Sequence, residues 1–174
     1  MPLEWVLTRR HRFLQHHQPN EPAPLGTLTQ QTHSDNVLLL RPVDTPFRNR
    51  NGNGSDDLVT VATCALPPGR QDDFATRWRS DAQPILEASG ARIDAAFVSE
   101  KSGNSFPNLP VREGETVFVW VSAFPDEVSY QAHLTKLNSL PDWTESVFPW
   151  LDSQVWRPVD ITRLRPTTRS NHRW

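Results

Sequence analysis

Cysteine and long apolar runs are scarce in this sequence of 174 residues, and each of these shortages excludes a structural feature. A single cysteine, Cys64, excludes an intrachain disulfide, and its place in a β-branched segment predicts a small buried apolar side chain. No run approaches the roughly 18 apolar residues of a membrane-spanning helix. Met1 opens no signal-peptide pattern. The sequence therefore predicts a soluble cytoplasmic protein without a membrane span.

There is no excess of positive charge, because the formal net charge is −2 at pH 7; the basic residues are nearly all arginine, and lysine occurs only as Lys101 and Lys136. A net charge of this sign does not attract nucleic acid or an anionic membrane. Arg9, Arg10 and Arg12 form a short basic cluster, but no known nucleic-acid-binding module accompanies them. We therefore expect no nucleic-acid partner.

Motifs for metals and cofactors are missing as well. Gly-rich phosphate loops, Cys/His zinc spacings and a nucleophile elbow do not occur. Four histidines near the N-terminus could suggest a metal site, but two of them precede a proline-rich loop and their spacing is poor for one helix face: His11, His16, His17 and His33. We interpret this segment as a solvated basic helix, and we predict no metal and no cofactor.

The chain nevertheless contains enough apolar residues for a core, with 36% hydrophobic residues and seven tryptophans. Residues 48–57 are rich in Asn and Gly and contain no apolar side chain, which predicts a flexible linker. We therefore divide the chain into an N-terminal helix–strand extension at 1–47, the linker at 48–57 and a domain at 58–170. Within the extension, residues 36–41 are expected to form a strand that ends at Pro42.

The domain shows a regular order of expected elements. Strands are predicted at 58–66, 92–100, 116–122 and 159–165, and helices at 70–89, from about Asp126 onward, and at 143–151. Pro84 lies inside the first helical stripe, so we expect a kink or break one turn before it. The order β-α-β-β-α-β is that of a ferredoxin-like α+β unit, in which both helices cover one face of an antiparallel sheet.

The strand at 116–122 has apolar residues on both faces. Val117, Val119 and Val121 alternate with Phe118 and Trp120. Helices can cover only one face of the sheet, so the other face needs a second cover. We expect a second sheet packed face to face, supplied by another copy of the chain or by a repeat, and hence a homodimer.

A short internal sequence repeat is relevant to the possibility that a repeat within the chain supplies the second sheet. Leu40-Arg41-Pro42 recurs as Leu164-Arg165-Pro166, each at the end of an expected strand. The N-terminal extension can therefore be interpreted as a partial second repeat. A chance tripeptide in an Arg- and Pro-rich sequence is the alternative.

Three motifs together resemble the NIPSNAP family: VFVW at 117–120, LPDW at 140–143 and RLRPT at 163–167. The resemblance covers residues 57–170 and implies a dimeric α/β barrel related in fold to small antibiotic-biosynthesis monooxygenases and EthD-like proteins. It supplies no agreed catalytic residues and no cofactor. Phe118 stands where relatives often have histidine, and the tyrosine that often follows the strand tryptophan is missing near Ser122.

Five residues are candidates for a pocket between sheet and helices: Trp78, Trp120, Tyr130, His133 and Arg163. The tryptophans could form an aromatic wall for a flat ligand, or simply pack the core. Tyr130 and His133 share a helix face and could act as an acid/base pair, or His133 could be partly exposed beside a core tyrosine. Arg163, with Arg165, could bind an anion or form salt bridges at a sheet edge.

Glu100, Lys101 and Arg112 flank the longest loop, where they could border a pocket entrance or be solvated. Three functions remain open: a protein that binds a small hydrophobic or aromatic molecule, a non-catalytic interaction or assembly module, and a cofactor-independent monooxygenase-like or isomerase-like enzyme. The distinguishing observation is whether the space between sheet and helices is a cavity or is filled by Trp and Phe side chains.

Overall fold

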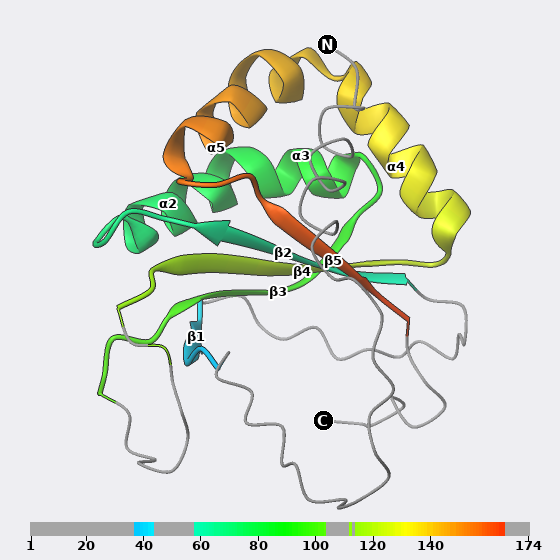
Figure 1. The fold of residues 1–174 in the computed structure, drawn as a ribbon. Coiled ribbons are helices and arrows are strands. Elements are labelled where there is room, and N and C mark those ends of the chain that lie inside the picture. Colours follow the sequence, from blue (N-terminus) through cyan, green and yellow to red (C-terminus); the bar gives the residue numbers. More distant parts are fainter. Residues whose placement is uncertain (1–36, 44–57, 104–111, 113, 166–174) are drawn as a thin grey trace, which may run out of the picture. The chain divides into compact units, whose positions relative to one another are not determined.

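The computed structural model describes residues 37–43, 58–103, 112 and 114–165 (Figure 1). The predicted N-terminal helix, the predicted linker at 48–57 and the four N-terminal histidines lie outside these residues. The chain divides into two compact units, Met1–Ser34 and Asp35–Trp174, and all the described residues belong to the second.

Five antiparallel strands form one sheet in the order β1-β3-β4-β2-β5. They are β1 (Leu40–Pro42), β2 (Leu58–Ala65), β3 (Arg92–Ser99), β4 (Val117–Phe124) and β5 (Asp160–Leu164). The order β3-β4-β2-β5, with helices after β2 and after β4, is the ferredoxin-like arrangement. The predicted α+β class is therefore confirmed, and the described helices lie together over one face of the sheet (Figure 1).

Each helical connection contains a π-helical turn just before a proline. The first runs through α2 (Gln71–Arg77), a π turn at Trp78–Ala82 and α3 (Gln83–Ala88); the second runs through α4 (Glu127–Ser139), a π turn at Asp142–Val147 and α5 (Phe148–Gln154). Pro84 and Pro149 occupy the first turns of α3 and α5. Because proline has no N–H and its ring collides with the carbonyl four residues earlier, the preceding turn widens to i→i−5 bonding. The break expected before Pro84 is thus a π turn, in which Gln83 N–H donates to Trp78 O.

The helix after β4 begins as expected at Asp126. The Asp126 carboxylate accepts a hydrogen bond from the Ser129 N–H at 2.6 Å, an N-cap that satisfies one of the free donors of the first turn. This hydrogen bond lowers the pKa of Asp126 below its usual value.

The main core lies between the sheet and the helices. Phe118, Trp120 and Phe124 of β4 face the helices and are almost fully buried. Cys64 of β2 faces the same way and is fully buried, as predicted, and burial raises the pKa of its thiol to about 12. This residue is therefore an inert apolar side chain rather than a reactive thiol.

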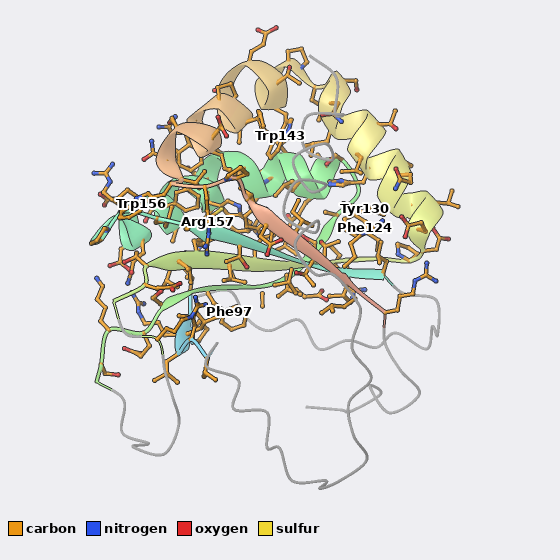
Figure 2. The ribbon with its side chains drawn as sticks, viewed as in Figure 1. Phe97, Phe124, Tyr130, Trp143, Trp156 and Arg157 are labelled. Atoms are coloured by element: carbon orange, nitrogen blue, oxygen red, sulfur yellow. The ribbon has the colours of Figure 1, made fainter. Side chains whose placement is uncertain are left out.

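The opposite face of the sheet is apolar too, and we call it the far face. The register pairs Val61 with Val121, Val119 with Phe97, and Ala95 with Val121 across β2, β4 and β3. Figure 2 shows Phe97 on the side of the sheet opposite to Tyr130. The far face is defined by six residues: Val59, Val61, Ala95, Phe97, Val119 and Val121.

A strand from the predicted N-terminal extension forms part of this sheet. Leu40 pairs with Ser99 and Pro42 with Phe97, and the Val43 N–H donates to Ala96 O at 2.9 Å. Arg41 forms an ion pair with Asp72 of α2. The Leu-Arg repeat therefore falls on the strands at the two ends of the described strand order, β1 and β5.

Candidate functional site

The aromatic residues predicted to line a pocket form a closely packed cluster. Trp78 lies in the first π turn, with its ring centroid 5.0 Å from that of Phe118 and 5.6 Å from that of Trp120. Phe118 and Trp120 are 6.1 Å apart, and Phe74 lies 5.1 Å from Phe118 on the other side. Trp78 is 1% exposed and Trp120 7% exposed, so the two predicted tryptophans do meet, and aromatic rings fill the space around them.

One polar atom in this cluster, the indole nitrogen (Nε1) of Trp78, is buried without a hydrogen bond to the described residues. Leaving a buried donor without an acceptor costs about 1–3 kcal/mol. The indole N–H is therefore a donor that a bound acceptor atom could satisfy.

His133 projects from α4 into a buried hydrogen-bond chain at the end of α3. Its Nδ1 lies 2.9 Å from Ser89 Oγ, and the Ser89 hydroxyl donates to Leu86 O at 2.8 Å. Since the single hydroxyl hydrogen is used in that bond, the proton on His133 lies on Nδ1 and is donated to Ser89 Oγ. Burial lowers the pKa of His133 and a hydrogen bond to the Ser89 backbone partly opposes this, so the ring is neutral at pH 7.

Tyr130 lies on the same face of α4, as predicted. Its ring centroid is 6.5 Å from that of His133, and Phe124 packs against both rings at 5.1 Å and 5.0 Å. Figure 2 shows Tyr130 and Phe124 close together. Tyr130 is 9% exposed and His133 5% exposed, which corrects the expectation that His133 would be partly exposed. The Tyr130–His133 pair is thus enclosed by the core, and its contacts are those of a structural support between α3 and α4.

Arg163 occupies a different environment from the other four candidates. It is exposed on β5, and its Nη1 lies 2.9 Å from Glu127 Oε1, while Arg165 Nη2 lies 3.8 Å from Glu127 Oε2. This corresponds to the salt-bridge alternative for the two arginines. The loop charges are paired locally as well, Lys101 with Asp72 and Arg112 with Glu115.

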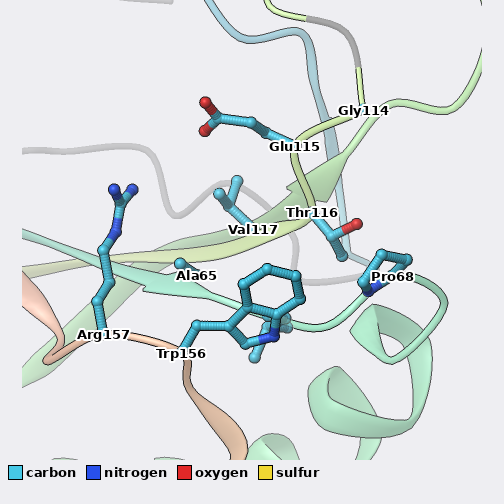
Figure 3. Close-up of a pocket in the computed structure, with 9 residues that line it drawn as sticks. Ala65, Pro68, Gly114, Glu115, Thr116, Val117, Trp156 and Arg157 are labelled. Atoms are coloured by element: carbon cyan, nitrogen blue, oxygen red, sulfur yellow. The ribbon is translucent and has the colours of Figure 1, made fainter.

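A pocket that the sequence analysis did not single out lies where β2 ends and β4 begins (Figure 3). Its volume is about 240 Å³, and its walls come from the end of β2, the following turn, the approach to β4 and the α5–β5 connection. It is lined by Ala65, Leu66, Pro68, Gly114, Glu115, Thr116, Val117, Trp156 and Arg157. In the sequence, this pocket is marked only by the adjacent residues Trp156 and Arg157 before Pro158. They belong to no periodic pattern, so sequence reasoning missed them.

Two searches concern only the residues that the structure describes. Among them, no group of three or more His, Cys, Asp or Glu side chains is arranged to hold a metal ion. None of their helices has the length and apolar character needed to cross a membrane.

Comparison with known proteins identifies the fold. No sequence-family profile matches the chain, and no curated protein matches it. The structure is similar to an uncharacterized NIPSNAP domain protein from Burkholderia xenovorans (19% identity, TM-score 0.50, covering 64% of this chain and 95% of that one). A NIPSNAP-like domain protein from the same organism gives 16% identity, a TM-score of 0.53 and coverages of 69% and 93%.

A NIPSNAP family protein from Agrobacterium tumefaciens gives 12% identity, a TM-score of 0.52 and coverages of 69% and 94%. At these identities the similarity establishes the fold. The chain has the fold of NIPSNAP proteins, as the sequence resemblance predicted.

Proposed function

We propose that this chain is a member of the NIPSNAP family that works as a homodimeric, non-catalytic assembly module. Family membership is supported by the order of the three sequence motifs together with the shared fold. The dimer is supported by the apolar far face of the sheet.

The far face is the observation that carries the proposal. Val59, Val61, Phe97 and Val121 are only partly buried in the single chain, although they lie on three neighbouring strands. Burying apolar surface contributes about 25 cal/mol per Å², so a second copy of the same face is the natural cover. Two such sheets would pack about 10 Å apart and exclude water from both.

A non-catalytic role is supported by the contents of the layer between sheet and helices. Phe118 replaces the histidine that relatives often have, and it packs against Trp78 and Trp120. Ser89 and His133 are 4% and 5% exposed, so a substrate would have to displace core side chains to reach them. The oxygenase-like and isomerase-like alternatives receive less support than the assembly role.

Binding of a small hydrophobic or aromatic molecule in this layer is the second candidate. The unpaired Trp78 Nε1 favours it, because a ligand acceptor atom would satisfy this donor. Such a ligand would have to move Phe118 or Trp120, since these rings occupy the space beside Trp78. A cytoplasmic location stays a prediction from the sequence.

Sedimentation velocity tests the dimer directly. The wild-type chain of 19.9 kDa should sediment at twice this mass at micromolar concentration. Val121→Glu places a charge in the middle of the far face and should give a folded monomer, whereas Val128→Glu on α4, where the residue is 77% exposed, should stay dimeric. A wild-type monomer, or a Val121→Glu dimer as tight as the wild type, would refute the proposed interface.

A further inference from the structure

We propose that the pocket between Trp156 and Arg157 binds a small planar aromatic carboxylate, with its ring against the Trp156 indole and its carboxylate on the Arg157 guanidinium. This site lies apart from the aromatic cluster around Trp78 and goes beyond the proposed assembly role. Its volume of about 240 Å³ limits a bound molecule to one or two rings.

The backbone of the pocket is fixed by hydrogen bonds between its segments. The Leu66 N–H donates to Thr116 O at 2.8 Å, which joins the end of β2 to the approach to β4. The Trp156 N–H donates to Ala65 O at 3.0 Å, which attaches the α5–β5 connection to the same strand. Pro158 restricts the backbone of Arg157. The two proposed contact residues therefore project from a held backbone, so binding would require little ordering of the chain.

Trp156 supplies an aromatic surface that the fold does not use. Its side chain is 69% exposed, whereas Trp78 and Trp120 are almost completely buried in the core. Figure 3 shows the indole standing at the pocket between Ala65 and Pro68, where a planar ring could lie against it. Stacking on such a face adds to the gain from burying apolar area.

The charges around the pocket favour an anion. Glu115 Oε1 already accepts a hydrogen bond from Arg112 Nη1 at 2.7 Å, so its charge is compensated. Arg157 is exposed and forms no ion pair within the described ranges, which leaves its positive charge available. A guanidinium can bind a carboxylate through two parallel hydrogen bonds. An aromatic ring with a single carboxylate matches this combination.

Isothermal titration calorimetry with 2-naphthoate tests the site, with the neutral 2-naphthamide as the matched probe. The wild-type protein should bind 2-naphthoate at least 10-fold more tightly than 2-naphthamide, because only the acid can pair with Arg157. Trp156→Ala and Arg157→Gln should each weaken 2-naphthoate binding about 10-fold or more, and Trp156→Phe should retain most of it. Arg79→Gln, which removes an exposed arginine from the π turn, is the charge-matched control and should bind like the wild type.

Three outcomes would overturn the proposal. The first is no heat of binding for 2-naphthoate up to millimolar concentration, and the second is equal binding of the acid and the amide. The third is loss of the dimer, which is relevant here because Ala65 and Val117 of the pocket pair with each other at one end of the far face. If Trp156→Ala converts a dimer to a monomer in sedimentation, the indole belongs to the subunit interface. A monomeric wild type that still binds 2-naphthoate through Arg157 would refute the proposed dimer and leave this site standing.

Discussion

At the scale of single residues, the two kinds of tryptophan in this chain should respond differently to the same substitution. Trp120→Ala removes a ring that is 7% exposed and contacts Trp78 and Phe118, so the free energy of unfolding should fall by about 3–5 kcal/mol. Trp156→Ala, at a residue 69% exposed, should change it by less than about 0.5 kcal/mol. Urea denaturation measures both changes.

The same measurement separates the two interpretations of the aromatic cluster. A Trp120→Ala protein with unchanged stability and lost affinity for an aromatic ligand would mean that the ring lines a pocket instead of packing the core. The contacts of Trp78 with Phe118 and Trp120 favour the packing interpretation.

His133 should give stability a pH dependence with a definite sign. Burial lowers the pKa of the folded-state ring, so the unfolded chain binds a proton at this residue before the folded chain does. The stability contribution of the neutral ring is present above the unfolded pKa of about 6.5 and is lost as pH falls toward the folded pKa. Between pH 7 and pH 5 the wild type should therefore lose stability more steeply than His133→Gln.

Thermal unfolding of the two proteins across that range provides the check, with the difference between them as the readout. Asp72, Asp81 and Asp126 have lowered pKa values and lose their contributions at more acidic pH, so they do not obscure the comparison. Identical slopes for wild type and His133→Gln would show that burial does not hold the His133 ring neutral in the folded protein.

At the scale of elements, local signals predicted much of the fold. The alternation in β4, the cap at Asp126 and the break before Pro84 each depend on residues close in sequence, and each was found. The second π turn follows the same rule, because Pro149 stands two residues after it, as Pro84 stands two residues after the first. A proline within an amphipathic helical segment thus marks a preceding π turn in this fold. In the first connection, that turn contains Trp78, which is buried in the core.

Long-range relations were harder to predict. Nothing near Leu40 indicates that it would pair with Ser99, and the burial of His133 depends on Ser89 and Phe124, which lie 44 and 9 residues away in the sequence. The pocket at Trp156 combines segments far apart in the sequence, and its two proposed contact residues lie on the α5–β5 connection, which has no periodic pattern. Candidate sites that depend on such tertiary neighbours are not visible in the residue pattern, whereas the aromatic pair Trp78 and Trp120 was visible because both lie on strongly patterned elements.

At the scale of the whole molecule, we expect the folded domain to include β1. A boundary in the predicted linker at 48–57 would leave β1 outside the domain, although its strand pairs with β3 and Arg41 forms an ion pair with Asp72. The division of the chain at Ser34 and Asp35 keeps β1 with the sheet. The two boundaries give opposite expectations for truncated proteins.

We expect a chain that begins at residue 35 to unfold at about the wild-type temperature, because it retains β1 and all its pairings. A chain that begins at residue 58 should be less stable by several degrees and should aggregate more readily. The backbone groups of β3 that bond to β1 and Val43, and the Glu100 N–H that bonds to Leu39, would be left unpaired at an open edge. Differential scanning calorimetry and light scattering on the two proteins measure these effects. Equal stability of both truncations would place the boundary in the 48–57 segment and make β1 an addition that the sheet does not need.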